Sequence, residues 1–308
     1  MTDDISTYRG VYPIAPTPFT DNQALDIESQ RRVLDCMVDQ GVDGLCILAN
    51  YSEQFLLSDT ERAQLLDVCL SHVAGRVPVI VTVSHFSTRI AVERARDAAA
   101  AGAAMLMLMP PYHGATLRAD EAGIFEHYRD IAEAVDIPLM VQDAPLSGVA
   151  LSVPFLARLA QSIDQIRYFK IEQPGTAAKL RALIEQGGGA IEGPFDGEES
   201  ITLLSDLDAG ATGTMPSALL PDLIKPVLDA YLAGDRAMAK SHYERILPLI
   251  NYENRQCGLR ATKTVMQAGG VIASAAVRHP LPPLDAATTK GLEELVTELN
   301  PIAATWGR

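Results

Sequence analysis

Short apolar segments alternate with amphipathic helical segments along most of this 308-residue chain. A strand, a helix and a further strand in that order predict parallel strands joined by right-handed crossovers. We expect eight such strands, at residues 10–19, 44–50, 78–84, 103–110, 138–144, 168–172, 190–194 and 212–217. Because eight strands close a (β/α)8 barrel, we predict an α/β fold of the TIM-barrel class. An open doubly wound sheet is the alternative, although no GxGxxG motif follows the first strand.

Capping residues mark the starts of the connecting helices. Ser58 and Glu61 form a capping-box pattern, and Ser152 precedes another helix with a proline in its first turn. The alternation then stops, and the rest of the sequence predicts three more helices. We therefore divide the chain into a barrel at residues 1–233 and a C-terminal helical extension at residues 234–308.

The overall composition argues against nucleic acid and membranes as partners. With a formal net charge of −14, the chain would repel a phosphate backbone or an anionic membrane surface. No run of about 18 apolar residues offers a membrane span, and the N-terminal stretch lacks the features of a signal peptide. The four cysteines include no CxxC pair, which favours reduced core thiols over disulfides or a metal site. We expect a cytoplasmic protein.

One charged residue interrupts an apolar strand, since Lys170 lies between Phe169 and Ile171. An ammonium group is costly to bury without a partner. In a TIM barrel the reactive residues lie at the carboxyl ends of strands, and this lysine is in the sixth predicted strand. A desolvated amine there would have a lowered pKa and could form a Schiff base with a carbonyl substrate. The alternatives are a lysine that reaches solvent at the rim and one that pairs with Glu172.

Polar side chains follow several other predicted strands. The second strand leads into Asn50, Tyr51 and Ser52, a polar segment that suits a carboxylate or ketone oxygen, although a plain turn would look the same. His85 follows the third strand, where it could exchange protons near neutral pH or be structural. Tyr112 follows the fourth strand in a loop stiffened by two prolines, either as a proton relay or as a packed aromatic side chain.

The fifth and seventh strands end in segments of different chemistry. Gln142 ends the fifth strand, and glutamine can hydrogen-bond but cannot transfer a proton. After the seventh strand, the glycines of GPFDGEE offer backbone amides at the start of an expected helix, which favours anions. We interpret Glu198 and Glu199 there as charges that favour the helix dipole and take no part in chemistry.

Together these segments resemble the class I aldolase-like family of dihydrodipicolinate synthase and N-acetylneuraminate lyase. The family's GxxGE loop after strand two is similar to ANYSE at 49–53, its strand-four PYY to PPY at 110–112, its strand-five YNxP to QDAP at 142–145, and its Schiff-base IKE to KIE at 170–172. The similarity runs over nearly the whole chain, from YPIAPTPF to VRHPLPPL. It implies a (β/α)8 barrel with a C-terminal helical extension.

The resemblance implies an imine between the strand-six lysine and a 2-keto-3-deoxy sugar acid, with no metal or organic cofactor. On this basis the catalytic set is Lys170, Tyr112 and Gln142, and the substrate-binding set is Asn50, Tyr51, Ser52, His85, Glu172, Gly193 and Gly197. It also implies a homo-oligomer, a dimer of dimers, in which Tyr112 reaches the neighbouring subunit's site.

Two departures from the family pattern bear on the reaction type. Gln142 stands where the family has a tyrosine that shuttles protons, and Asn50 stands where it has a threonine or serine hydroxyl. Retro-aldol cleavage needs a base for the C4 hydroxyl proton, which glutamine cannot be. Elimination instead removes a C3 proton and expels the C4 hydroxyl. The strand-end segments CILANYSEQF, MPPYHGAT, QDAP, FKIE and EGPFDGEE together resemble a dehydratase branch of this family. This resemblance implies dehydration of L-2-keto-3-deoxyarabonate to 2,5-dioxopentanoate in pentose catabolism.

Several alternatives remain open on the sequence. Tyr112, His85, Glu172 and a bound water are all candidates for proton transfer. The main enzymatic rival is an aldolase that releases pyruvate from a related keto sugar acid. A barrel that binds keto acids without catalysis is the rival from another functional class.

Overall fold

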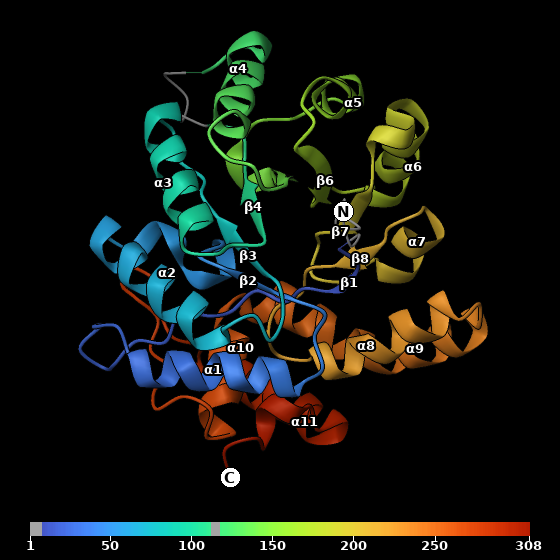
Figure 1. Cartoon of the computed structure of the whole chain (residues 1–308). Helices are drawn as coiled ribbons and strands as arrows, with labels where there is room; N and C mark the ends of the chain where they lie inside the picture. The colour runs from blue at the N-terminus through green and yellow to red at the C-terminus, as the bar shows by residue number, and fades with distance from the viewer. Residues whose placement is uncertain (1–7, 112–117) are drawn as a thin grey trace.

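Eight parallel strands form the centre of the molecule. The computed structural model describes residues 8–111 and 118–308. The strands are β1 (Gly10–Val11), β2 (Leu45–Ile47), β3 (Val79–Thr82), β4 (Met105–Leu108), β5 (Leu139–Asp143), β6 (Ile166–Ile171), β7 (Gly193–Asp196) and β8 (Gly213–Thr214). They pair in parallel in the order β1-β8-β7-β6-β5-β4-β3-β2, with helices around them (Figure 1). The predicted α/β barrel is confirmed, although most strands are shorter than expected and β7 begins three residues late.

A single residue closes the barrel between its first and second strands. Ile14 forms isolated parallel bridges to both Cys46 and Ser217. The amide of Cys46 donates to the Pro13 carbonyl at 2.9 Å, and the amide of Ala15 donates to the Cys46 carbonyl at 2.8 Å. The sheet therefore forms a closed ring rather than the open doubly wound alternative.

In the described residues, seven helices connect consecutive strands and an eighth follows β8. They are α1 (Ile27–Asp39), α2 (Asp59–Val73), α3 (Thr88–Ala100), α4 (Glu121–Ala132), α5 (Val153–Ser162), α6 (Thr176–Gly187), α7 (Leu203–Asp208) and α8 (Pro221–Leu232). The capping box of α2 is confirmed, since Ser58 Oγ accepts from the Glu61 amide at 3.2 Å and the Glu61 carboxylate accepts from the Ser58 amide at 2.9 Å. Ser152 caps α5 as predicted.

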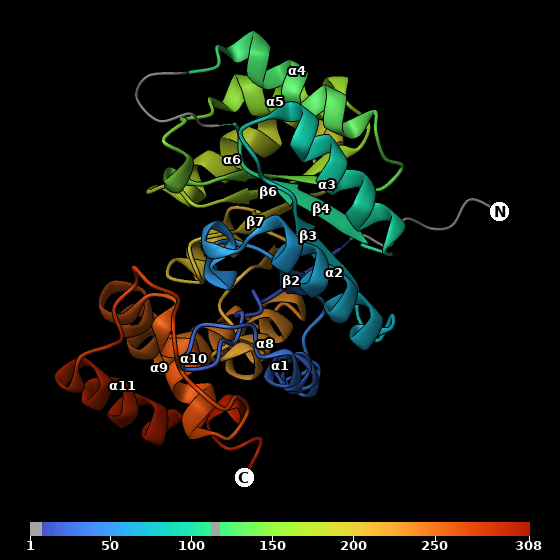
Figure 2. The same cartoon turned by 90° about the vertical axis from the view of Figure 1, so that its left-hand side faces the viewer.

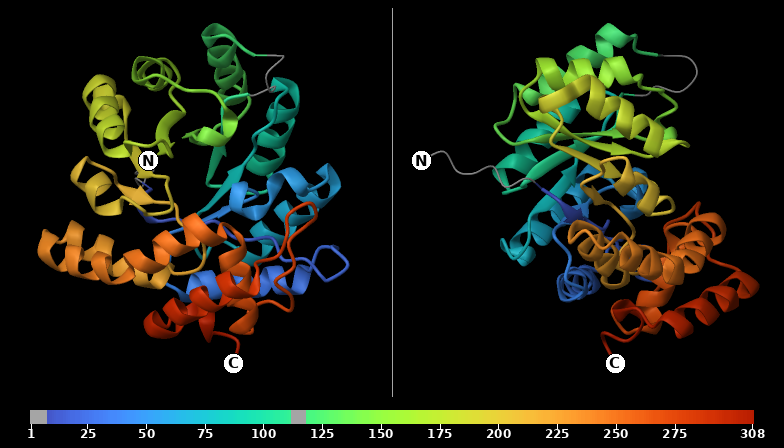
Figure 3. Two further views of the ribbon diagram at one scale, coloured as in Figure 1. Left: turned by 180° about the vertical axis from the view of Figure 1, so that it is seen from behind. Right: turned by 90° about the vertical axis from the view of Figure 1, so that its right-hand side faces the viewer.

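The three predicted C-terminal helices are present as α9 (Arg236–Tyr252), α10 (Arg260–Ala268) and α11 (Ala286–Leu299). A π-helical turn at Glu253–Cys257 joins α9 to α10. These helices gather on one side of the barrel, in orange and red (Figures 2 and 3). Helix α9 of the extension packs along α8 of the barrel, so the two parts are in direct contact. The division of the chain into domains at residues 233 and 234 stays a prediction. In the parts of the chain described, no helix is long and apolar enough to span a membrane.

Two apolar clusters occupy the two faces of the strands. The outer cluster lies between strands and helices and includes Phe169 and Ile171. The inner cluster fills the barrel and includes Tyr168, Cys46 and methionines of β4 and β5. All four cysteines are buried free thiols, as predicted. Because side chains alternate along a strand, Lys170 shares the inner face with Tyr168 and projects into the barrel.

Candidate active site

Lys170 is buried within the barrel and has a carboxylate partner. Only 1% of the residue is exposed, which excludes the lysine that reaches solvent at the rim. Its Nζ lies 2.7 Å from Glu172 Oε1, the pairing that the sequence left as an alternative. Gln142 pairs with Lys170 across β5 and β6, and its Nε2 donates to the same Glu172 oxygen at 2.7 Å. The sequence-predicted Lys170, Glu172 and Gln142 therefore form one hydrogen-bonded group.

The charge state of this lysine differs from the sequence-based expectation. Burial lowers the pKa of Lys170, but the nearby acids, Glu172 foremost, outweigh it, so the pKa is raised above its usual value. The expected lowering was wrong because the strand sequence does not show which acids face the amine. Imine formation needs the neutral amine, so the proton must first pass to an acceptor, and Glu172 is in contact to receive it.

Glu199 is an acidic group that the sequence analysis did not assign to the site. Its Oε2 is buried and has no hydrogen-bond donor among the described residues. Burial raises the pKa of Glu199 well above its usual value, which favours a neutral acid that can donate a proton. The expected helix start was wrong, since α7 begins only at Leu203 and residues 198–202 form a bend and a turn. A Gly-Glu-Glu segment directly after a barrel strand was the signal available.

Gly197 allows the turn to approach the lysine closely. A Cβ at this position would lie 2.7 Å from the Cγ atoms of both Lys170 and Glu172, so no larger residue fits without displacement. The Gly197 amide donates to the Ile171 carbonyl at 3.0 Å, which occupies it within the protein. The contribution of Gly197 is therefore space beside the reactive group, rather than the anion-binding amide expected from the sequence.

The loop after β2 forms a short 3-10 turn at Asn50–Ser52. Ser52 Oγ donates to the Ala15 carbonyl at 2.6 Å and accepts from the Ala49 amide at 3.1 Å, so this hydroxyl holds the loop in place. Asn50 Oδ1 accepts from Gln54 Nε2 at 2.7 Å. Glu53, in the left-handed conformation at φ 57°, follows this turn.

The C-terminal extension contacts both loops at this end of the barrel. Tyr51 donates its hydroxyl to Asn254 Oδ1 at 3.0 Å, and Arg255 pairs with Glu198 at 3.1 Å. Both partners lie in the π-helical turn, a helix irregularity often found at functional sites. Burial raises the pKa of the Tyr51 hydroxyl, with Glu199 adding to the effect. The sequence left the role of the extension open. In the structure, the extension packs beside the loops that follow β2 and β7.

Two predicted site residues, Gly193 and His85, do not join this group. Gly193 begins β7 at its amino-terminal end and packs against the Tyr168 ring, so it is remote from the carboxyl end of the strand. We withdraw it as a substrate-binding residue. His85 accepts from the Ser87 amide at 3.0 Å and lines a separate cavity of about 130 Å³. Tyr112 lies outside the described residues.

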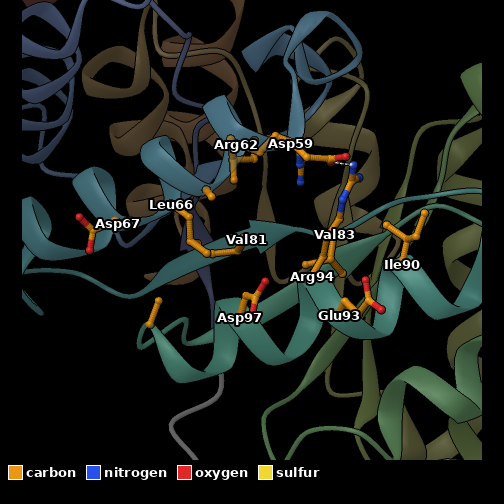
Figure 4. Close-up of a pocket in the computed structure, with 13 residues that line it drawn as sticks. Asp59, Arg62, Leu66, Asp67, Val81, Val83, Ile90, Glu93, Arg94 and Asp97 are labelled. Atoms are coloured by element: carbon orange, nitrogen blue, oxygen red, sulfur yellow. Dashed lines mark hydrogen bonds and ion pairs between the residues drawn. The ribbon is translucent and has the colours of Figure 1, made fainter.

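A further cavity of about 400 Å³ lies between α2 and α3, outside the strands (Figure 4). Its apolar wall includes Leu66, Val81, Val83 and Ile90. Arg62 donates to the Thr82 carbonyl and Arg94 to the Ser84 carbonyl, each at 2.7 Å. Because Val81 and Val83 belong to the outer cluster, this cavity is on the opposite face of the sheet from Lys170. The arginines brace the end of β3 from outside.

Comparisons with known proteins agree with this geometry. Residues 7–299 match the dihydrodipicolinate synthetase family. The chain is 55% identical over 299 residues to the L-2-keto-3-deoxyarabonate dehydratase of Azospirillum brasilense, covering 97% of each chain. It is 31% identical to a 4-hydroxy-tetrahydrodipicolinate synthase of Synechococcus sp. (strain WH7803), covering 92% of this chain and 93% of that one. The fold matches YagE, a dihydrodipicolinic acid synthase family protein of E. coli K12 solved with pyruvate, with a TM-score of 0.88, 25% identity, and 96% and 100% coverage.

Proposed function

The chain belongs to the dihydrodipicolinate synthetase family, and from this premise we propose that it dehydrates L-2-keto-3-deoxyarabonate to 2,5-dioxopentanoate. The protein is a lyase that works through a Schiff base. The observation that carries this proposal is the group at Lys170, where Gln142 stands in place of the strand-five tyrosine expected in an aldolase and donates to Glu172, the partner of the lysine. The 55% identity to an L-2-keto-3-deoxyarabonate dehydratase supports the substrate.

The reaction divides into steps that the side chains can serve. Lys170 passes a proton to Glu172 and attacks C2 of the keto acid. Glu172 then returns that proton to the C2 hydroxyl, which leaves as water as the protonated imine forms, so that Glu172 is again a carboxylate. The imine acidifies the C3 hydrogens, and Glu172 is the base that takes one of them. The enamine then expels the C4 hydroxyl, which leaves as water with the proton held by Glu199. The unsaturated imine then loses a proton from C5 and gains one at C3, while the C5 hydroxyl proton passes to C4 and C5 becomes the aldehyde carbon. Hydrolysis of the imine releases the product and the lysine.

Gln142 serves this reaction through a hydrogen bond rather than a proton. Its Nε2 donates to Glu172 and fixes the carboxylate beside the lysine. Its Oε1 is buried and has no donor among the described residues, so it is available to a substrate hydroxyl. The turn at Asn50–Ser52 is the proposed site for the substrate carboxylate, because it follows β2 at the carboxyl end of the strands, the end at which active sites of such barrels lie.

Product analysis tests the reaction directly. The purified protein is incubated with L-2-keto-3-deoxyarabonate, and the products are separated and identified. Formation of 2,5-dioxopentanoate is expected. Release of pyruvate and glycolaldehyde would contradict dehydration and identify the protein as an aldolase. Borohydride with pyruvate tests the imine: Lys170 should gain a reduced pyruvate adduct, and its absence would favour a barrel that only binds keto acids.

We further propose a cytoplasmic homo-oligomer, a dimer of dimers, with a role in L-arabinose catabolism. The support for assembly is a set of exposed apolar side chains on the loops after β2, β3 and β5, namely Phe55, Phe86 and Leu146 at 48%, 42% and 54% exposure. Light scattering on the eluting protein should give four times the mass of one chain. Fractionation of the source cells would test the compartment.

A further inference from the structure

A buried pair of aspartates lies beneath the turn that carries Glu199. Asp196 ends β7 and Asp206 lies on α7, and both are 0% exposed. Asp196 accepts three hydrogen bonds: from the Glu198 amide at 3.2 Å, the Ser200 amide at 3.0 Å and the Thr214 hydroxyl at 2.6 Å. Each of these donors stabilises the ionised form of Asp196.

The backbone above this carboxylate is held in an uncommon conformation. Glu199 has φ 53° and Ser200 has φ 68°, and both lie in the left-handed region that side chains other than glycine seldom adopt. Two consecutive residues of this kind persist only where the surroundings enforce them. Asp196 accepts from the amides on either side of Glu199, so it fixes the direction in which that side chain leaves the turn.

Asp206 lacks the donors that Asp196 has. Its Oδ2 accepts from the Thr202 hydroxyl at 2.6 Å, while its Oδ1 is buried without a donor among the residues described. Its other contact is a hydrogen bond with the Asp196 side chain. Two carboxylates can form such a bond only if one carries a proton. Since Asp196 already accepts three bonds, the proton belongs to Asp206, and burial beside Asp196 raises the pKa of Asp206 to about 7.

The other charged groups around the pair favour a protonated Asp206 and an ionised Asp196, or are paired with an opposite charge. Glu198 in the turn adds negative charge near Asp206, but Arg255 of the extension pairs with it. Lys170 favours the ionised form of Asp196 from β6. Tyr243 of α9 donates its hydroxyl to the turn carbonyl of Ser200 at 3.3 Å and is neutral in this range.

We propose that Asp196 and Asp206 are positioning residues, which share one proton, and that this proton holds the turn that presents Glu199 to Lys170. The inference rests on the proposed function, because it concerns the group that protonates the departing hydroxyl. With the proton in place, Asp206 donates a hydrogen bond to Asp196 and the turn that carries Glu199 is held in position. Once the proton is lost, two buried carboxylates repel each other, and the turn moves away from the lysine.

Two substitutions of Asp206 separate the proton from the side chain. In Asp206→Asn an amide donates to Asp196 at every pH, so kcat should stay within about threefold of wild type near pH 6.5 and should lose the wild-type fall above pH 7. Asp206→Leu keeps the branching at Cγ but supplies no donor, so its kcat should fall on the order of tenfold at pH 6.5. Asp208→Asn is the matched control, since it makes the same change on the same helix at a surface ion pair with Arg236.

Kinetics of dehydration from pH 5.5 to 9 are measured beside borohydride trapping of pyruvate on Lys170. Both Asp206 variants should trap pyruvate as wild type does, because the imine does not need the proton of Glu199. Equal pH profiles for wild type and Asp206→Asn would overturn the proposal, as would full activity of folded Asp206→Leu. If Asp206→Leu does not fold, the profile of Asp206→Asn decides alone. A wild-type protein that neither traps pyruvate nor dehydrates would refute the proposed function itself, whatever the variants do.

Discussion

The buried ion pair between Lys263 of α10 and Glu53 of the β2 loop leads to a strong prediction about stability. Both side chains are 0% exposed. Lys263 Nζ also donates to the Ala276 carbonyl at 2.9 Å and lies 4.4 Å from the centre of the Phe19 ring. Glu53 Oε2 accepts from the Arg278 amide at 2.9 Å. This pair fastens the C-terminal extension to the loop that begins at Asn50.

Replacing Lys263 by Met keeps most of the side-chain volume but leaves Glu53 as a buried charge with one amide donor. Removing one partner of a buried pair costs about 3–5 kcal/mol, and for a chain of this size that lowers the Tm by roughly 6–10 °C. In the double variant Lys263→Met with Glu53→Gln, no charge remains buried, so at least about 2 kcal/mol should be recovered. Urea unfolding followed by circular dichroism measures all three proteins.

An exposed lysine on the neighbouring helix provides the control. Lys240 is 56% exposed and pairs with Glu244 at 3.2 Å, so Lys240→Met should change the free energy of unfolding by less than about 0.5 kcal/mol. The reasoning fails if Lys263→Met is as stable as this control. It also fails if the double variant is no more stable than Lys263→Met alone. Because this loop contains the proposed carboxylate site at Asn50–Ser52, KM of Lys263→Met should rise as well.

Three further outcomes are expected. Tyr51→Phe removes the hydroxyl bond to the extension, worth about 1 kcal/mol, so KM should rise about fivefold in steady-state kinetics, and an unchanged KM would separate Tyr51 from binding. Gly197→Ala should lower kcat on the order of 100-fold and slow pyruvate trapping, because its methyl group would displace the lysine. Arg278 holds the pKa of Glu61 at about 2, so this pair stabilises the fold above about pH 4.5 and the stabilisation is lost as pH falls towards 2. In acid unfolding, Glu61→Gln should therefore lose less stability than wild type between pH 4.5 and 2.

The sequence predicted the barrel because an apolar strand segment recurs eight times along the chain. An error in the bounds of one strand does not change the number of strands. It predicted Lys170 as a reactive residue because a charged ammonium group inside an apolar strand is costly to bury and stands out in the local sequence. Gln142 and Glu172 followed from their places at the strand ends.

What the sequence could not supply was the pairing of segments distant along the chain. The pKa of Lys170 was expected to be lowered, but nearby acids raise it, foremost Glu172 and after it Glu199, which comes from a different strand-end loop. Glu199 itself was interpreted as a helix-start charge, because nothing local shows that Asp196 holds a turn there and delays the helix to Leu203. The contacts of Asn254 and Lys263 likewise join residues more than 200 positions apart.

The single-residue closure at Ile14 also determines when the barrel can close during synthesis. Ile14 bridges Cys46 and Ser217, so both edges of the nascent sheet stay open until the ribosome has released residue 217. At about 5–20 residues per second, the stretch from residue 46 to residue 217 takes roughly 10–30 s to emerge. For that time the free edge of β2 can pair with another nascent chain. A burst of translation would therefore load the chaperone system with half-closed sheets, and slower synthesis should improve the soluble yield.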